Sequence, residues 1–317
     1  MNNEKKISKI FTNQIFFLSS LIIILGIIAT IFNPRFLSLQ NLVNILQQNS
    51  ILGIVAIGAT LVMISGNFDI SVGYMVSFAT CVISVLIYKG FNIFFSVIIG
   101  FLICVLCGLF NGVIIAKTRT PSFIITLASM SIFYGASLIV SGGASHSLGG
   151  KFSTLGRDNL FNVIPYNIIV MTIIFILVYI LLRFTKFGRR IYAIGGNEAA
   201  AYLSGVDTDT TKILIYIING ALVGLASLVL VSKLGSAQPT TGQGIELKAI
   251  AAVVIGGVPL TGGKGTAIGT FLGVILTGLI SNILNILNIS AYYQQIVLGV
   301  IIIIAVIVSN IGGIRRK

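Results

Sequence analysis

Apolar segments long enough to cross a lipid bilayer recur along the chain, and no other feature constrains its fold as strongly. An α-helix rises about 1.5 Å per residue, so about 20 apolar residues cross the hydrocarbon core. Only 9% of the residues are charged, whereas soluble domains carry about 25%. The sequence therefore predicts an all-α integral membrane protein with a polytopic helix bundle. Its clear spans are 15–32, 70–88, 91–116, 122–141, 166–183, 212–231, 267–288 and 291–310.

Two further apolar segments are less regular. Residues 42–65 make one span with a polar start, whereas residues 249–258 are short and run into a Gly-Gly-Val-Pro sequence. Such a segment suits a broken or re-entrant element, which is tolerated at membrane depth where protein buries it. We expect about ten transmembrane helices, with one short or broken segment near 249–265. Eight crossings are the alternative if neither irregular segment spans.

Basic residues cluster in short segments between the apolar runs and give the chain a net charge of +13. Cytoplasmic loops of membrane proteins carry an excess of Lys and Arg. This pattern predicts a single transmembrane permease domain (15–310) with a cytoplasmic loop at 184–211 and cytoplasmic tails at 1–14 and 311–317. The loops 142–163 and 233–248 then lie outside. Anionic lipid headgroups are the natural partner of these basic segments, and nucleic acid is not expected.

Glycines mark two features of the predicted bundle. Residues 64–73 and 255–265 each contain an apolar run, a glycine break and polar residues before the next helix. Paired interrupted segments in the two halves of a transporter point to its central site. Small-xxx-small faces allow close approach of helices in lipid, and they occur at Gly108/Gly112 and Gly269/Gly273.

Uncharged polar residues recur within the apolar helices and have two interpretations. They suit a pathway for a neutral, hydroxyl-rich solute, and they also suit hydrogen bonds between helices. Asp69 is the one acidic residue that we expect at membrane depth, where it lines the pathway or caps the helix that follows; the cap is favoured. A single acid argues against ion-coupled transport. The candidate pathway-lining residues are Gln47, Asn67, Asp69, Asn285 and Gln294.

The cytoplasmic loop contains a short helix with clear end signals. Asn197 is a good N-cap, Glu198 suits the positive end of the helix, and Gly205 can terminate it. About two turns are too few to persist alone in water. The helix must therefore dock, either on its own bundle or on a soluble partner inside the cell. Its apolar face consists of Ala199, Tyr202, Leu203 and Val206.

No residue pattern indicates catalysis or a metal site. His146 lies in a Gly/Ser-rich loop without a nucleophile or a ligand set nearby. Residues 262–266 lack the spacing of a phosphate-binding loop and instead suit a bend between helices. Cys104 and Cys107 lie among apolar residues, which favours small buried side chains over redox or metal chemistry. We expect a chain that is not an enzyme and binds no cofactor or metal of its own.

Several stretches together resemble one family of permeases. Glu198-Ala199-Ala200 followed by Gly205 resembles the coupling motif of ABC-importer permeases. The permease subunit of simple-sugar importers of the ribose, xylose and galactose type is similar over longer stretches: GRRIYAIGGNEAAAYLSGV (188–206), SGNFDISVG (65–73), PSFIITLASMSIFYGASLIVSGG (121–143), LGSAQPTTGQGIELKAIAAVVIGGVPLTGGKGT (234–266) and YYQQIVLGVIIIIAV (292–306).

The resemblance implies an assembly in the bacterial cytoplasmic membrane. Two permease copies would form one pathway, ABC ATPase subunits holding ATP and Mg would dock inside, and an extracytoplasmic sugar-binding protein would deliver the solute. Permeases for nucleosides or the autoinducer sugar share much of the pattern, so the solute stays open, as do a secondary transporter and a scaffolding membrane protein. The residues expected to couple to the ATPase are Asn197, Glu198, Ala199, Ala200, Tyr202, Leu203 and Gly205.

Overall fold

The computed structural model describes residues 14–161, 164–290, 292–297, 299–301, 303 and 307. Long helices make up most of this part of the chain: α2 (Gln14–Phe32), α3 (Leu39–Ile64), α4 (Val72–Tyr88), α5 (Ile93–Thr118), α6 (Ser122–Ser141), α8 (Tyr166–Phe184), α11 (Thr208–Leu234) and α13 (Ala267–Ile286). Seven of them are long and apolar enough to cross a membrane, and α4 is shorter, at 17 residues.

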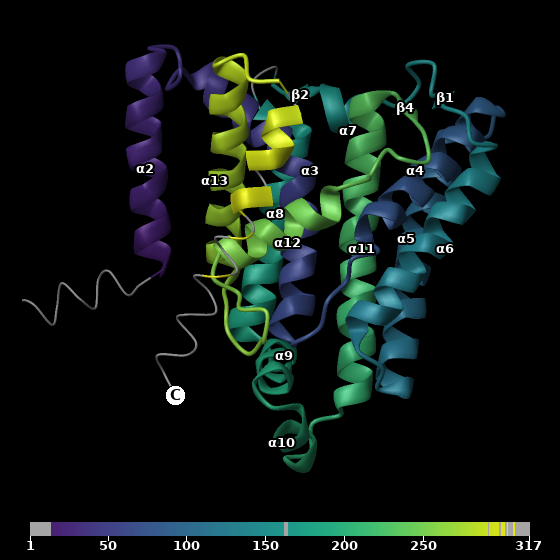
Figure 1. The fold of residues 1–317 in the computed structure, drawn as a ribbon. Helices are drawn as coiled ribbons and strands as arrows, with labels where there is room; N and C mark the ends of the chain where they lie inside the picture. The colour runs from purple at the N-terminus through teal and green to yellow at the C-terminus, as the bar shows by residue number, and fades with distance from the viewer. Residues whose placement is uncertain are drawn as a thin grey trace, which may run out of the picture.

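Short elements connect these helices at the two ends of the bundle. The helices are α7 (Thr154–Arg157), α9 (Lys186–Gly196), α10 (Glu198–Leu203) and α12 (Ile245–Ile255). The two-residue strands β1 (His146–Ser147) and β4 (Ser236–Ala237) pair with each other, as do β2 (Asn159–Leu160) and β3 (Ile164–Pro165). Figure 1 shows α9 and α10 at one end, and α7, β1 and β4 at the other.

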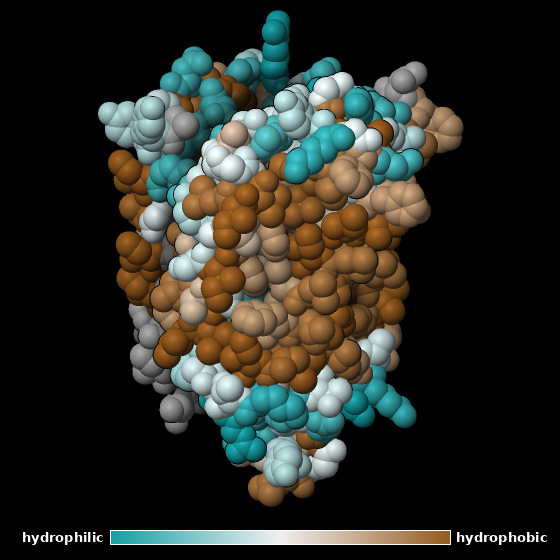
Figure 2. Space-filling view, turned by 90° about the vertical axis from the view of Figure 1, so that its right-hand side faces the viewer, coloured by the Kyte–Doolittle hydropathy of each residue, from teal (hydrophilic) through white to brown (hydrophobic). Residues whose placement is uncertain are grey.

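The surface confirms the predicted class of protein. Figure 2 shows a broad hydrophobic band between two hydrophilic ends, on the side where Figure 1 places α5 and α6. Large apolar side chains of both helices are exposed there, as expected for a face that contacts lipid. They include Phe94, Phe95, Leu102, Leu106, Phe123, Ile124 and Leu127. The protein is a polytopic helical membrane protein.

In the part of the chain that the structure describes, non-helical backbone interrupts two crossings of the bundle. One of them contains the segment near 249–265 that the sequence predicts to be short or broken. Residues 65–71 run without helical structure from the end of α3 to the start of α4. Residues 235–244 lead into α12, which has only 11 residues, and a loop then connects α12 to α13. The short element near 249–265 is therefore confirmed. The predicted span 291–310 and both predicted tails lie largely or wholly outside the described residues.

The two glycine breaks identified in the sequence meet at the end of the bundle that carries α9. The amide of Gly263 donates to the carbonyl of Ile64 over 2.8 Å. Gly66, Gly262 and Gly263 have φ values of 79°, 75° and 74°, which glycine adopts far more readily than other residues. Gly195 of α9 packs against both breaks, without space for a side chain. Three separate backbones therefore touch at this glycine junction, and the predicted bend at 262–266 is confirmed.

Helices α5 and α11 pack through their small residues. A Cβ atom on Gly108 would collide with the carbonyl oxygen of Tyr216, and one on Gly220 would lie 3.2 Å from the Cα of Gly108. The predicted close approach at Gly108/Gly112 is therefore present, between α5 and α11. Cys104 lies in this contact region and is buried and free, as is Cys107.

Candidate functional site

The short helix α10 has the ends that its sequence predicts. Asn197 is extended (φ −163°), and its side chain accepts a hydrogen bond from the amide of Ala200 over 2.9 Å. Glu198 occupies the first turn, and Gly205 follows the helix with φ 82°. An N-cap of this kind satisfies an amide that the helix itself leaves free. The predicted cap and glycine terminus are therefore confirmed for this helix of six residues.

An ion pair fastens α10 to the start of α11. The ammonium of Lys212 lies 2.5 Å from the Glu198 carboxylate, with side chains 8% and 47% exposed. Ala201 is also buried against the bundle. Sequence reasoning missed Lys212, although a lysine at the start of an apolar span was the available signal. Docking of α10 on its own bundle thus accounts for one side of the helix.

The other side of α10 remains uncovered. Tyr202 is 65% exposed and Leu203 is 85% exposed, and Ala199 and Ala200 are exposed as well. Ala199, Tyr202 and Leu203 come from the face predicted to dock, together with Val206, which is half-buried. A helix this short with exposed apolar side chains at the tip of the molecule is suited to binding a partner.

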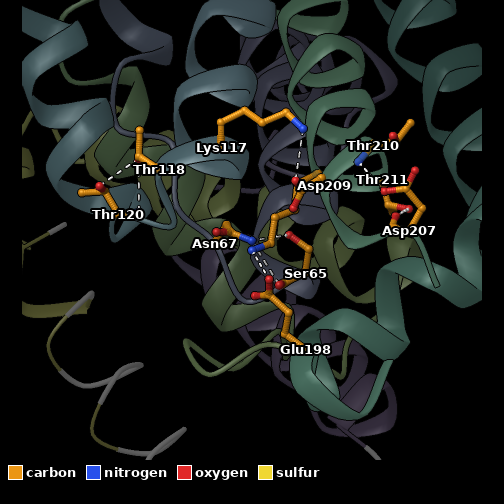
Figure 3. Close-up of polar contacts among 11 residues, drawn as sticks. Ser65, Asn67, Lys117, Thr118, Thr120, Glu198, Asp207, Asp209, Thr210 and Thr211 are labelled. Atoms are coloured by element: carbon orange, nitrogen blue, oxygen red, sulfur yellow. Dashed lines mark hydrogen bonds and ion pairs between the residues drawn. The ribbon is translucent and has the colours of Figure 1, made fainter. Parts of the chain in front are cut away.

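A cavity of about 830 Å³ lies beside α10. Its walls come from α10, the loop between α5 and α6, the break 65–71 and the start of α11. Its polar lining includes Asn67, Arg119, Thr120, Ser122, Glu198, Thr208 and Lys212. Glu198 of α10 and Asn67 of the break both line this cavity, and both are labelled in Figure 3. The cavity therefore connects the exposed short helix with one of the two broken crossings.

Two acidic residues lie at the N-terminal end of α11, near this cavity. Asp207 caps the helix by accepting from the amide of Thr210 over 3.0 Å. Hydrogen bonding with the side chain and the backbone of Thr210 holds the pKa of Asp207 below its usual value. Asp209 forms an exposed ion pair with Lys117 at 3.2 Å, seen in Figure 3. Negative charge at a helix N-terminus is favourable, so both acids stabilise the start of α11.

Asp69 lies in the break before α4 and is only 4% exposed. Its Oδ1 accepts from the amide of Ser71 (3.0 Å) and from its hydroxyl (2.6 Å), and its Oδ2 accepts from Nδ2 of Asn219 (2.9 Å). Ser71 is itself the N-cap of α4, so Asp69 holds the turn just before the helix rather than the cap position.

Asn111 Nδ2 donates to Ser71 Oγ (2.9 Å), and Ser129 Oγ donates to Asn111 Oδ1 (2.6 Å). Asp69 thus links the break to α5, α6 and α11.

The five candidate pathway residues fall into separate groups. Asn67 adjoins Asp69 and donates to Ser65. Gln47 is on α3 about 25 Å from that end of the helix, at 1.5 Å per residue, and its carbonyl accepts from Asn167 and Lys233. Asn285 is exposed and accepts from Gln294 over 2.8 Å. Their role in lining a pathway stays a prediction.

Hydrogen bonds between helices explain part of the polar pattern. Asn41 of α3 and Asn282 of α13 exchange two amide hydrogen bonds, of 3.1 and 3.0 Å. Buried polar groups in lipid need such partners. The interhelical interpretation therefore holds for Asn41 and Asn282.

The expectation of a single acid inside the bundle was wrong. Glu246 is 5% exposed, and its Oε1 accepts from the amide of Gly244 over 3.1 Å. Its Oε2 has no hydrogen-bond partner among the residues that the structure describes. The cause is the start of α12 at Ile245 rather than near residue 249, in a crossing that packs against α3 and α13. The preceding segment also packs inside, where the amide of Gly242 donates to Ser77 Oγ over 2.9 Å.

Apolar crossings, two glycine breaks and a short capped helix at one end define a membrane permease. Comparison with known proteins agrees: the family described as "Branched-chain amino acid transport system / permease component" matches residues 41–306. The chain belongs to this permease family. It is 42% identical to the ribose import permease protein RbsC of Bacillus subtilis (strain 168), over 90% of each chain.

Other relatives extend the comparison. The ribose import permease protein RbsC of Escherichia coli (strain K12) is 39% identical, over 92% of each chain. The autoinducer 2 import system permease protein LsrC of Yersinia pestis (strain Pestoides F) is 34% identical, over 90% of this chain and 80% of that one. No solved structure matches the chain.

Proposed function

We propose that the chain is the transmembrane subunit of an ATP-driven importer and forms the pathway for a small neutral solute, most simply ribose. The observation that carries the proposal is α10, which is fastened to the bundle by Lys212 while Tyr202 and Leu203 stay exposed. The ribose import permeases among its relatives support the solute.

The proposed assembly has four kinds of component. A cytoplasmic ABC ATPase, which would hold ATP and Mg, docks on α10 through Ala199, Ala200, Tyr202, Leu203 and the residues that cap the helix, Asn197, Glu198 and Gly205. An extracytoplasmic sugar-binding protein docks at the opposite end. A second copy of the chain completes the pathway as a homodimer, within the bilayer.

The proposed orientation in the bacterial cytoplasmic membrane follows from charge. Basic residues gather at the end that carries α10, including Lys117, Arg119, Lys186, Arg189 and Arg190. Cytoplasmic segments are enriched in such residues. This end, with the loop 184–211 and both chain termini, is therefore proposed to be cytoplasmic.

Purification and reconstitution test the proposal. The chain should co-purify with an ATPase, and in vesicles the complex with a binding protein should couple uptake of labelled ribose to ATP hydrolysis. Glu198→Lys should abolish uptake without changing the affinity of the binding protein for ribose. Uptake by the single chain driven by an ion gradient alone would contradict the proposal and establish a secondary transporter instead.

Autoinducer 2 is the alternative solute, because one of the relatives is a permease for it. LsrC, an autoinducer 2 import permease, covers 90% of the chain. The same vesicles should therefore be assayed with autoinducer 2, and with nucleosides as a further comparison. Stimulation of ATP hydrolysis by autoinducer 2 and not by ribose would assign the chain to that solute while leaving the importer mechanism in place.

A further inference from the structure

Three buried polar side chains of α11 each bond to a segment outside that helix. Lys212, Tyr216 and Asn219 are 7%, 0% and 0% exposed. Their spacing of four and three residues places them on one helical face. They form a column along the first turns of α11, starting at the end of the bundle where α10 lies.

Lys212, the first residue of the column along α11, binds α10. Lys212 is almost wholly buried, and Glu198 of α10 is its acidic partner at 2.5 Å. A buried ammonium that loses its acidic partner is destabilised. Moving α10 away from the start of α11 would therefore cost free energy, which favours movement of the two helices together.

The upper two members hold the break before α4. The hydroxyl of Tyr216 donates to the carbonyl of Phe68 over 2.7 Å, and Nδ2 of Asn219 donates to Asp69 over 2.9 Å. Non-helical backbone at membrane depth has no ladder of its own and depends on such side-chain partners. Helix α11 therefore supplies one of the hydrogen bonds that hold each of residues 68 and 69, beside those from Ser122 and Ser71.

We propose that Lys212, Tyr216 and Asn219 are positioning residues that transmit displacement of α10 to the break at 65–71, and so to the foot of α4. This rests on the proposed function and names the route by which the ATPase acts on the membrane part. The route is specific: it runs through one face of α11 and reaches Phe68 and Asp69 directly.

The test measures uptake and hydrolysis together in vesicles that contain the whole importer. Tyr216→Phe removes a single oxygen atom and retains the ring in its packing. We expect ATP hydrolysis to stay within about twofold of the unchanged protein, while ribose taken up per ATP falls about fivefold, which corresponds to one hydrogen bond of ordinary strength. Lys212→Met and Asn219→Leu should lower the same ratio, and Lys212→Arg should retain much of it.

Matched controls separate transmission from general damage. Lys117→Met breaks the exposed ion pair to Asp209 near the same end of α11, and Tyr179→Phe removes a hydroxyl from a partly exposed tyrosine of α8. Both should leave the ratio unchanged. An unchanged ratio in Tyr216→Phe, or equal losses of uptake and hydrolysis, would overturn the proposed route even if Lys212→Met fails to fold. Absence of coupled uptake in the unchanged complex would instead refute the proposed function.

Discussion

Gly195 of α9 packs directly on the backbone of Gly263, with 2.6 Å between the position of a Cβ on Gly195 and the Gly263 amide nitrogen. The same Cβ would collide with the carbonyl oxygen of Ile64. Neither contact can be relieved by rotating a side chain, because both partners are backbone atoms.

Replacing Gly195 should therefore destabilise the protein. Gly195→Ala forces the glycine junction apart, and overpacking of this kind costs about 1–3 kcal/mol. The next residue is a matched control, because a Cβ on Gly196 meets nothing within 4 Å. Thermal unfolding in detergent should show a lower midpoint for Gly195→Ala and no loss for Gly196→Ala; equal midpoints would contradict the contact.

Leu203 should matter for assembly and not for stability. It is 85% exposed at the tip of the molecule, and Leu203→Ser removes apolar surface without opening a cavity, so unfolding should change by less than about 0.5 kcal/mol. Co-purification of the ATPase should nevertheless be lost. Phe161→Ser is the control, with an 86% exposed side chain at the opposite end; retained co-purification in Leu203→Ser would exclude α10 as the docking element.

Glu246 should lower the stability of the folded protein. Its Oε2 is buried without a partner, and an unpaired buried carboxylate is costly in a membrane protein. Glu246→Gln removes the charge at nearly equal volume and should raise the free energy of unfolding by about 1–3 kcal/mol. If stability rises and uptake falls, the carboxylate is retained for function; lower stability would mean that it has a partner in the assembled protein.

Asp207 should contribute stability that depends on pH. Its pKa is lowered in the folded protein, chiefly by the hydrogen bond from Thr210. The contribution is therefore fully present above the ordinary carboxyl pKa of 3.8 and is lost as pH falls through the lower folded value. Asp207→Asn keeps a good cap. In this variant the stability should fall less steeply than in the unchanged protein when unfolding is measured from neutral to acidic pH. The same loss of stability at acidic pH in both proteins would show that other groups cause it.

The long helices and the caps of α10 could be predicted because their signals are local. Apolar length locates a span, and Asn197 and Gly205 act on backbone within a few residues. The same holds for the bend at 262–266, where successive glycines allow the backbone conformation.

The route of the two broken crossings could not be predicted, because distant residues determine it. Phe68 is held by Tyr216 and by the Ser122 hydroxyl, which accepts from its amide. Lys212 and Glu246 were missed for the same reason. Lys212 stood at the start of a predicted span and Glu246 in a predicted loop, and only the packing of the folded chain shows that both side chains are buried. A site assembled from side chains far apart in the sequence leaves no pattern at any one place.

The glycine contact between α5 and α11 carries a consequence for the bilayer. With the backbones at Gly108 and Gly220 in contact, neither helix can turn about its own axis without a collision, so α5 travels with α11. Helix α5 also presents Phe94, Leu102, Leu106 and Phe110 on its outer surface. Any movement driven through α11 therefore displaces lipid chains as well as protein, and the thickness and stiffness of the surrounding membrane enter the energy of each transport cycle.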